Sequence, residues 1–97
     1  MIIRKVDLEI NKENLKAFEN IFTERNPSLN NVEGCQRVEL VKHPDVEYGY
    51  STISLWDSEE ALSDYRNSDY FNQTWKMLKP LFASKAKAIT YNLVAKS

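Results

Sequence analysis

The sequence predicts an α+β fold whose elements follow one another in the order β-α-β-β-α-β. Apolar residues alternate with charged ones near the start of the chain, and two later segments carry apolar residues at helical spacing. A turn at residues 43–45 separates two segments that are rich in β-branched and aromatic residues. Alternation is typical of a half-buried strand, and steps of three and four residues are typical of an amphipathic helix.

The first strand is expected at residues 2–10, where Val6, Leu8 and Ile10 share one face. Asn11 is a suitable N-cap for a helix over residues 12–25. The apolar face of that helix contains Leu15, Phe18, Ile21 and Phe22. Asn26-Pro27 should end it, because the residue before a proline avoids the helical region.

The middle of the chain is typical of a β-hairpin. Gly34, between Glu33 and Cys35, is free to adopt a positive φ in a turn. Strands are expected at residues 35–42 and 48–56, joined by the turn at His43-Pro44-Asp45.

Two helices are expected in the second half. Asp57 or Ser58 caps the first, with acidic residues in its opening turn, and Ser68 caps the second. The second helix carries an apolar stripe and has Pro80 near its end. The stripe consists of Phe71, Thr74, Trp75, Leu78 and Phe82. A last strand is expected at residues 86–94, followed by a frayed tail at residues 96–97.

This order is the ferredoxin-like pattern, a four-stranded antiparallel sheet with helices on one face. Apolar residues nevertheless fall on both faces of the sheet; they include Ile3, Val41, Ile53, Leu55, Ile89, Tyr91 and Leu93. The uncovered face needs a second layer, and the simplest one is another copy of the chain, packed sheet to sheet as a homodimer.

Composition narrows the class of protein. Residues 1–97 suit a single domain, and 13 basic against 14 acidic residues give no bias toward nucleic acid or an anionic membrane. Charged residues interrupt the N-terminal apolar run, so we expect neither a signal peptide nor a membrane span, and a cytoplasmic location. One Cys35 and one His43 make a disulfide framework or a Cys/His metal site implausible.

The chain resembles the antibiotic biosynthesis monooxygenase (ABM) family over essentially its whole length. The resemblance rests on the Glu33-Gly34-Cys35 turn, the strand ending at Trp56, the W-x-S-x-E-A-L run over residues 56–62, and S-x-x-F over residues 68–71. It implies a dimeric α+β barrel with a small-molecule pocket in each subunit. Some members oxidise phenols or quinols with oxygen and no metal or flavin, others degrade haem, and many have no established activity.

Several positions depart from the family's pattern. Tyr65 and Tyr70 stand where many members carry histidines, and the strand before Trp56 offers Ser51, Thr52 and Ser54 where some quinone-forming members have an asparagine. Haem-degrading members need a helical histidine, whereas His43 belongs to a predicted turn. Haem binding is therefore the least favoured interpretation, and no cofactor or metal is expected.

The candidate substrate-binding residues are Trp56, Tyr65, Tyr70, Trp75 and Thr52. Trp56 could stack on a flat substrate or fill the helix–sheet interface. The two tyrosines could donate hydrogen bonds to a phenolic oxygen or only pack, and a tyrosine with a pKa near 10 is a poor base at neutral pH. Trp75 belongs to the core stripe but could reach the pocket, and Thr52 lies on a strand face that lines a pocket or meets a second copy.

Two functions fit the chain. The first is a cofactor-independent monooxygenase acting on a small aromatic or quinol-type compound; its catalytic residues are unknown. The alternative is a non-catalytic dimer, a small-molecule-binding or stress-response protein of the same fold.

Overall fold

A computed structural model of the chain describes residues 1–25, 29 and 31–95. Its elements confirm the predicted order, with the second helical region divided in two. They are β1 (Ile2–Glu9), η1 (Lys12–Asn14), α1 (Leu15–Arg25), β2 (Cys35–Lys42), β3 (Gly49–Trp56), α2 (Glu59–Arg66), α3 (Asp69–Leu78), η3 (Lys79–Leu81) and β4 (Lys87–Asn92).

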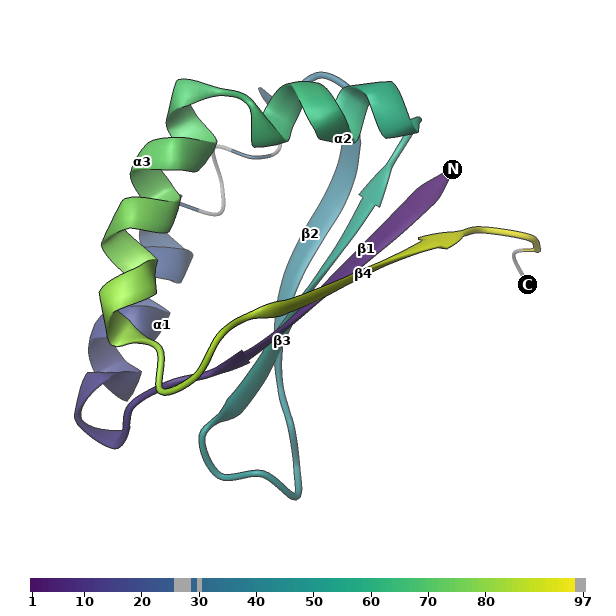
Figure 1. Cartoon of the computed structure of the whole chain (residues 1–97). Helices are drawn as coiled ribbons and strands as arrows, with labels where there is room; N and C mark the ends of the chain where they lie inside the picture. Colours follow the sequence, from purple (N-terminus) through teal and green to yellow (C-terminus); the bar gives the residue numbers. More distant parts are fainter. Residues whose placement is uncertain (26–28, 30, 96–97) are drawn as a thin grey trace.

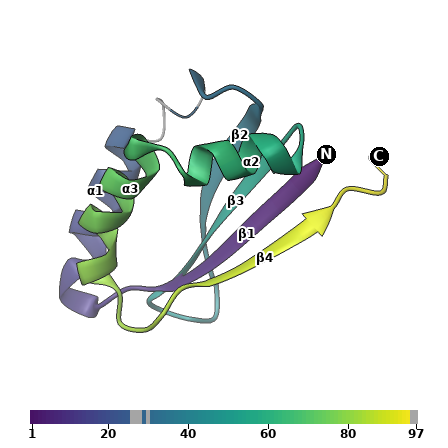
Figure 2. The same cartoon turned by 45° about the horizontal axis from the view of Figure 1, so that its top comes forward.

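The four strands form one antiparallel sheet in the order β2-β3-β1-β4. Figures 1 and 2 show α1, α2 and α3 on one face of this sheet, while none of the described helices lies on the opposite face. The sheet thus has a helix-covered inner face and an open outer face, as the ferredoxin-like pattern predicts.

Side-chain alternation assigns the core to the inner face. Val6 and Leu8 of β1 are buried there together with Tyr50 of β3 and Phe18 of α1. The Phe18 and Tyr50 rings lie 5.1 Å apart between centroids, and the Tyr50 hydroxyl donates to Glu19 Oε2 at 2.5 Å. Burial of both rings and this hydrogen bond hold α1 on the sheet.

The start of the first helix differs from the prediction. Asn11 makes no capping hydrogen bond; its side-chain Nδ2 donates instead to the carbonyl of Phe82 at 3.2 Å. The side-chain amide of Asn11 is therefore bound to a residue far away in the sequence. The helical region begins with the 3-10 turn η1, which α1 follows directly. The expected helix stop at residues 26–27 lies outside the described residues, as does the tail at residues 96–97.

Strand ends also shift by small amounts. Ile10 lies beyond β1 and forms an isolated bridge with Phe82. Tyr48 belongs to the turn before β3, and β4 is shorter at both ends than the expected residues 86–94. The turn prediction at Gly34 is confirmed, with φ at 82°.

The outer face mixes exposed apolar and charged side chains. Val41, Ile89 and Tyr91 are 40%, 45% and 47% exposed. Arg37 pairs with Glu39 within the same strand, and both side chains are exposed. No helix among the described residues has the length and apolar character needed to cross a membrane.

Candidate functional site

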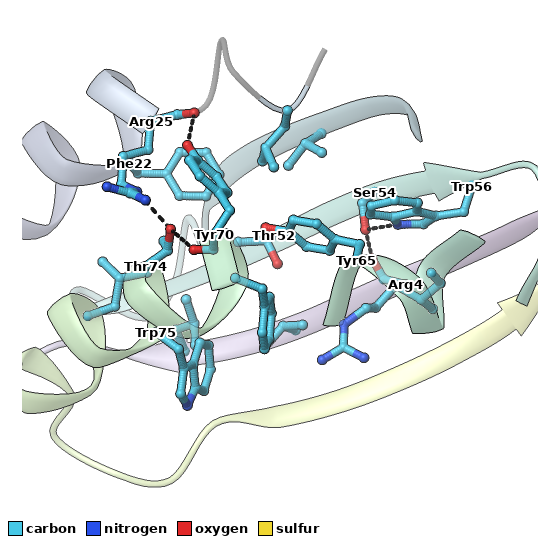
Figure 3. Close-up of a pocket in the computed structure, with 17 residues that line it drawn as sticks. Arg4, Phe22, Arg25, Thr52, Ser54, Trp56, Tyr65, Tyr70, Thr74 and Trp75 are labelled. Atoms are coloured by element: carbon cyan, nitrogen blue, oxygen red, sulfur yellow. Dashed lines mark hydrogen bonds between the residues drawn. The ribbon is translucent and has the colours of Figure 1, made fainter. Parts of the chain in front are cut away.

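A cavity of about 90 Å³ lies between the inner face of the sheet and the three helices. Figure 3 draws the 17 residues that line it. All five candidate substrate-binding residues, Thr52, Trp56, Tyr65, Tyr70 and Trp75, are among them. The sheet contributes Thr52 and Trp56, whereas α2 and α3 contribute the other three. The tertiary structure therefore brings together residues from three elements around one space.

Aromatic rings form a continuous wall along this cavity. The Trp56 and Tyr65 rings are stacked with centroids 5.1 Å apart, and Phe71 meets Tyr65 edge-on at 5.2 Å. Phe71 then stacks on Trp75 at 5.9 Å, and Trp75 meets Phe82 edge-on at 5.4 Å. Such contacts fix the orientation of the rings, so the wall is a preformed aromatic surface.

Trp56 is the buried end of this series of aromatic rings. Its side chain is only 1% exposed, and its indole Nε1 donates to Ser54 Oγ at 2.9 Å. Ser54 Oγ lies 3.4 Å from the backbone carbonyl of Arg4, to which it donates (Figure 3). Because the indole N–H is already engaged, Trp56 supports Tyr65 by stacking and has no free donor for a ligand.

Tyr70 is also engaged within the protein. Its hydroxyl donates to the backbone carbonyl of Arg25 at 2.8 Å, at the C-terminal end of α1. The Arg25 guanidinium lies 4.3 Å from the centre of the Tyr70 ring, and Arg25 Nε donates to Thr74 Oγ1 at 2.7 Å. Figure 3 shows these three side chains as one linked group. Tyr70 therefore lines the cavity with its ring, while its hydroxyl joins α1 to α3.

Tyr65 and Thr52 keep their hydroxyls free. Neither side-chain oxygen has a hydrogen-bond partner among the described residues, although both residues line the cavity. Burial raises the pKa of Tyr65 to about 12, with a further contribution from the nearby Tyr70 phenol. At neutral pH the Tyr65 hydroxyl is protonated, so it can donate a hydrogen bond but cannot act as a base.

The position of α2 depends on the turn before β2. Ser58 caps α2 by accepting from the Ala61 backbone N–H at 3.1 Å. A Cβ on Gly34 would lie 2.4 Å from the Ala61 side chain, so only glycine lets the turn approach α2 this closely. The Asp57 N–H donates to the Gly34 carbonyl at 2.8 Å. Together these contacts set α2 over the sheet and direct Tyr65 into the cavity.

Arg4 is a cavity residue that the sequence interpretation missed. It lies on β1 between Ile2 and Val6, on the same inner face, and is half-buried. A signal was present in the sequence, because Arg4 is a charged residue in phase with the apolar positions of its strand. The sequence interpretation also missed Arg25, because the Tyr70 ring that its guanidinium covers lies 45 residues away in the chain.

His43 and Cys35 lie outside the cavity lining. His43 Nε2 is 2.9 Å from Ser51 Oγ, which donates to Asp7 Oδ1 at 2.6 Å on the outer face of the sheet. Burial raises the pKa of the Cys35 thiol, as expected for a small packed side chain. Within the described part of the chain, no three His, Cys, Asp or Glu residues cluster as metal ligands would.

Solved structures of other proteins share this fold. A "putative antibiotic biosynthesis monooxygenase" from Caulobacter crescentus CB15 superimposes with a TM-score of 0.91 at 22% identity, covering 97% of this chain and 90% of its own. One of the same description from Nitrosomonas europaea has a TM-score of 0.90 at 10% identity, covering 98% and 100%. At these identities the likeness shows the fold alone.

A third solved structure agrees with these two. The Deinococcus radiodurans protein of the same description has a TM-score of 0.90 at 15% identity, covering 100% of this chain and 96% of its own. No curated protein is significantly similar to the chain. The family described as antibiotic biosynthesis monooxygenase matches residues 1–76, which include β1 to β3, α1, α2 and most of α3. The chain belongs to the antibiotic biosynthesis monooxygenase family.

Proposed function

We propose that the protein is a cofactor-independent monooxygenase that acts on a small aromatic or quinol-type compound. The observation that supports this proposal is the aromatic cavity lined by Tyr65 and Thr52, whose hydroxyls have no hydrogen-bond partner among the described residues. A flat, electron-rich ring suits the aromatic wall, and the hydroxyls suit an oxygen on that ring. Family membership supports a monooxygenase-like fold for the same chain.

The cavity would act by orienting the substrate and stabilising its anion. Its lining residues include no Asp, Glu or His, and Tyr65 stays protonated, so the substrate proton would leave to solvent. Hydrogen bonds from Tyr65 and Thr52 would hold the resulting oxyanion, since donors in a dry site stabilise negative charge strongly.

The oxidation of a one-ring quinol balances without a further reductant. One ring C–H becomes C–OH with one atom of molecular oxygen, the two quinol O–H groups become quinone carbonyls, and their hydrogens leave with the other oxygen atom as water. All four electrons come from the substrate, whose anion reacts with oxygen at a ring carbon. The protein would supply binding, orientation and exclusion of water.

Oxygen uptake tests this proposal. A panel of anthrone-type and quinol compounds should consume oxygen faster with protein than without, in proportion to protein concentration. Tyr65→Phe and Thr52→Val should lower kcat by about tenfold each, because each removes one hydrogen bond to the developing anion. Tyr48→Phe, a tyrosine in the β2–β3 turn, is the matched control and should leave the rate unchanged.

The alternative function is a non-catalytic binding dimer. It would be supported by saturable binding of the same compounds with no oxygen uptake above the blank across the panel. A haem-binding function would require a Soret shift on haemin titration, which we do not expect because His43 lies on the outer face, away from the cavity.

We further propose that two copies pack through their outer sheet faces. Val41, Ile89 and Tyr91 form exposed apolar surface there, and no helix in the described part of the chain covers it. Light scattering at micromolar concentration should give twice the 11.3 kDa chain mass. Ile89→Lys should yield monomers, because it places a charge in the interface. Met77→Lys, an equally exposed position on α3, should remain dimeric. A monomeric mass for the unmodified protein would overturn this proposal.

A further inference from the structure

Arg4 stands at the boundary between the covered and open parts of the inner sheet face. In the strand register it lies beside Ser54 of β3 and Thr90 of β4. Ser54 is 7% exposed beneath the helices, whereas Thr90 on the edge strand is exposed. The guanidinium of Arg4 therefore belongs to the mouth of the cavity, where a ligand would enter.

The charge of Arg4 has no counter-ion among the described residues. Neither of the two ion pairs, Lys5–Asp7 and Arg37–Glu39, involves it, and no described hydrogen bond engages its guanidinium. None of the residues that line the cavity is acidic, as the sticks in Figure 3 illustrate. Arg66 adds a second positive charge nearby, which acts on Arg4 in the same direction as burial. A half-buried cation in such surroundings is costly until an anion joins it.

Arg25, the other cavity arginine, is differently placed. Its guanidinium is bound to Thr74 and lies against the Tyr70 ring and the Met77 sulfur. Arg4 is thus the arginine whose donors are open to a ligand.

We infer that the cavity takes a one-ring aromatic compound carrying a carboxylate, and that Arg4 binds this carboxylate at the mouth. The planar guanidinium matches a carboxylate through two parallel hydrogen bonds. A carboxylate is charged at neutral pH, whereas an ordinary phenol with a pKa near 10 is not. The cavity of about 90 Å³ is smaller than the apolar cavity of about 150 Å³ that takes up benzene, so it leaves no room for a ligand of more than one ring.

For the ligand, this places the carboxylate at Arg4 and the ring against the wall that Tyr65, Phe71 and Trp75 form. In that orientation the opposite edge of the ring points inward, toward Thr52 and the Tyr65 hydroxyl. As a substrate, the compound would be a quinol-type dihydroxybenzoate, which supplies all four electrons itself and whose phenolic oxygen meets these donors. This last step rests on the proposed oxygenase function, but recognition of the carboxylate does not.

Matched ligands test the inference directly. Benzoate and benzamide have the same shape and differ in charge, and their binding can be followed by tryptophan fluorescence or calorimetry. We expect benzoate to bind roughly tenfold to a hundredfold more tightly, the range typical of a charge-assisted hydrogen bond. The preference should persist in 0.5 M salt, because a half-buried pair is screened less than a surface pair.

Variants of Arg4 test whether this residue causes the preference for benzoate over benzamide. Arg4→Gln should reduce it to within about twofold, and Arg4→Lys should keep part of it, since lysine retains the charge without the planar fork. Lys16→Gln is the control, because Lys16 is exposed on α1 and does not line the cavity, so the change should alter the preference by less than about twofold. Thermal melting establishes that each variant is folded; if Arg4→Gln is not, Arg4→Lys still tests the inference through its partial loss.

The outcomes separate this inference from the proposed function. Equal binding of benzoate and benzamide, binding of neither, or a preference that survives in Arg4→Gln would overturn it. An Arg4-dependent benzoate preference without oxygen uptake from 2,5-dihydroxybenzoate and the wider panel would leave it standing and remove the oxygenase proposal. Oxygen uptake with neutral quinols, without a preference for benzoate, would support the oxygenase proposal and overturn the carboxylate inference.

Discussion

The hydroxyl of Tyr70 donates to the backbone carbonyl of Arg25 at 2.8 Å, while the Arg25 guanidinium covers the same ring at 4.3 Å. One residue pair thereby closes the C-terminal end of α1 onto the first turn of α3. The carbonyls of a final helical turn have no partner within their own helix, so this contact satisfies one of them. Two side chains that line the cavity are thus engaged in holding its walls together.

Tyr70→Phe should lower the free energy of unfolding by about 1 kcal/mol, the typical contribution of one hydrogen bond. The matched control is Tyr65→Phe, whose hydroxyl has no partner among the described residues and whose loss should leave stability unchanged within about 0.5 kcal/mol. Urea denaturation at one fixed protein concentration measures both. Equal losses in the two variants would contradict the assignment of these hydroxyls.

Tyr65 and Tyr50 should make the protein sensitive to alkaline pH. Burial raises the pKa of both to about 12 from an ordinary value of 10, with the Glu19 hydrogen bond contributing at Tyr50. Between pH 10 and 12 the unfolded chain loses these protons while the folded chain keeps them, so stability falls as pH rises. Tyr65→Phe should move the midpoint of alkaline unfolding upward. An unchanged midpoint, followed by circular dichroism, would argue against the raised pKa of Tyr65.

Ser54→Ala should destabilise the protein by about 1–3 kcal/mol, because it leaves the buried Trp56 indole N–H without its acceptor. In a Trp56→Phe background the same change should cost much less, since phenylalanine has no N–H to satisfy. A double-mutant cycle by urea denaturation isolates this coupling. The same cost in both backgrounds would mean that the Trp56–Ser54 hydrogen bond contributes nothing.

Gly34→Ala should cost at least about 1–2 kcal/mol, the penalty for a left-handed backbone conformation in a residue with a Cβ. The clash with Ala61 adds to this and should displace α2. Gly49→Ala is the comparison, because its φ is not in the left-handed region and its new Cβ would meet the Val46 side chain at 2.9 Å. The urea midpoint of unfolding should therefore fall further for Gly34→Ala than for Gly49→Ala. The reverse order would refute the explanation that the positive φ and the close approach to Ala61 require glycine at position 34.

Much of the fold could be predicted because its signals are local. The alternation of apolar and charged residues predicted which face of β1 is buried. Ser58 and Ser68 accept the capping hydrogen bonds expected of them, and Gly34 has the positive φ predicted for its turn. Asn11 shows the limit of this reasoning. It occupies the predicted N-cap position, but its side chain makes no capping hydrogen bond, and its Nδ2 donates instead to the Phe82 carbonyl, 71 residues away.

The candidate site divides in the same way. All five predicted residues line one cavity, because each is placed there by the period of its own strand or helix. The sequence alone could not show which of Tyr65 and Tyr70 has a hydroxyl available to donate to a ligand. The Tyr70 hydroxyl is bound because the Arg25 carbonyl, 45 residues away in the chain, lies within hydrogen-bonding distance. Arg4 was hidden for a related reason, because whether a strand cation is paired depends on which side chains the other elements bring near it.

The sequence by itself determined the order of the elements, the faces of the strands and the aromatic residues that could meet, because these follow from local periodicity and capping. The tertiary structure decided which polar groups are engaged inside the protein and which have no partner among the described residues. Trp56, Tyr70 and Arg25 are engaged by partners 2, 45 and 49 residues away, whereas Arg4, Thr52 and Tyr65 are not engaged by the described residues. That distinction depends on distances that exist only after helices and sheet have packed.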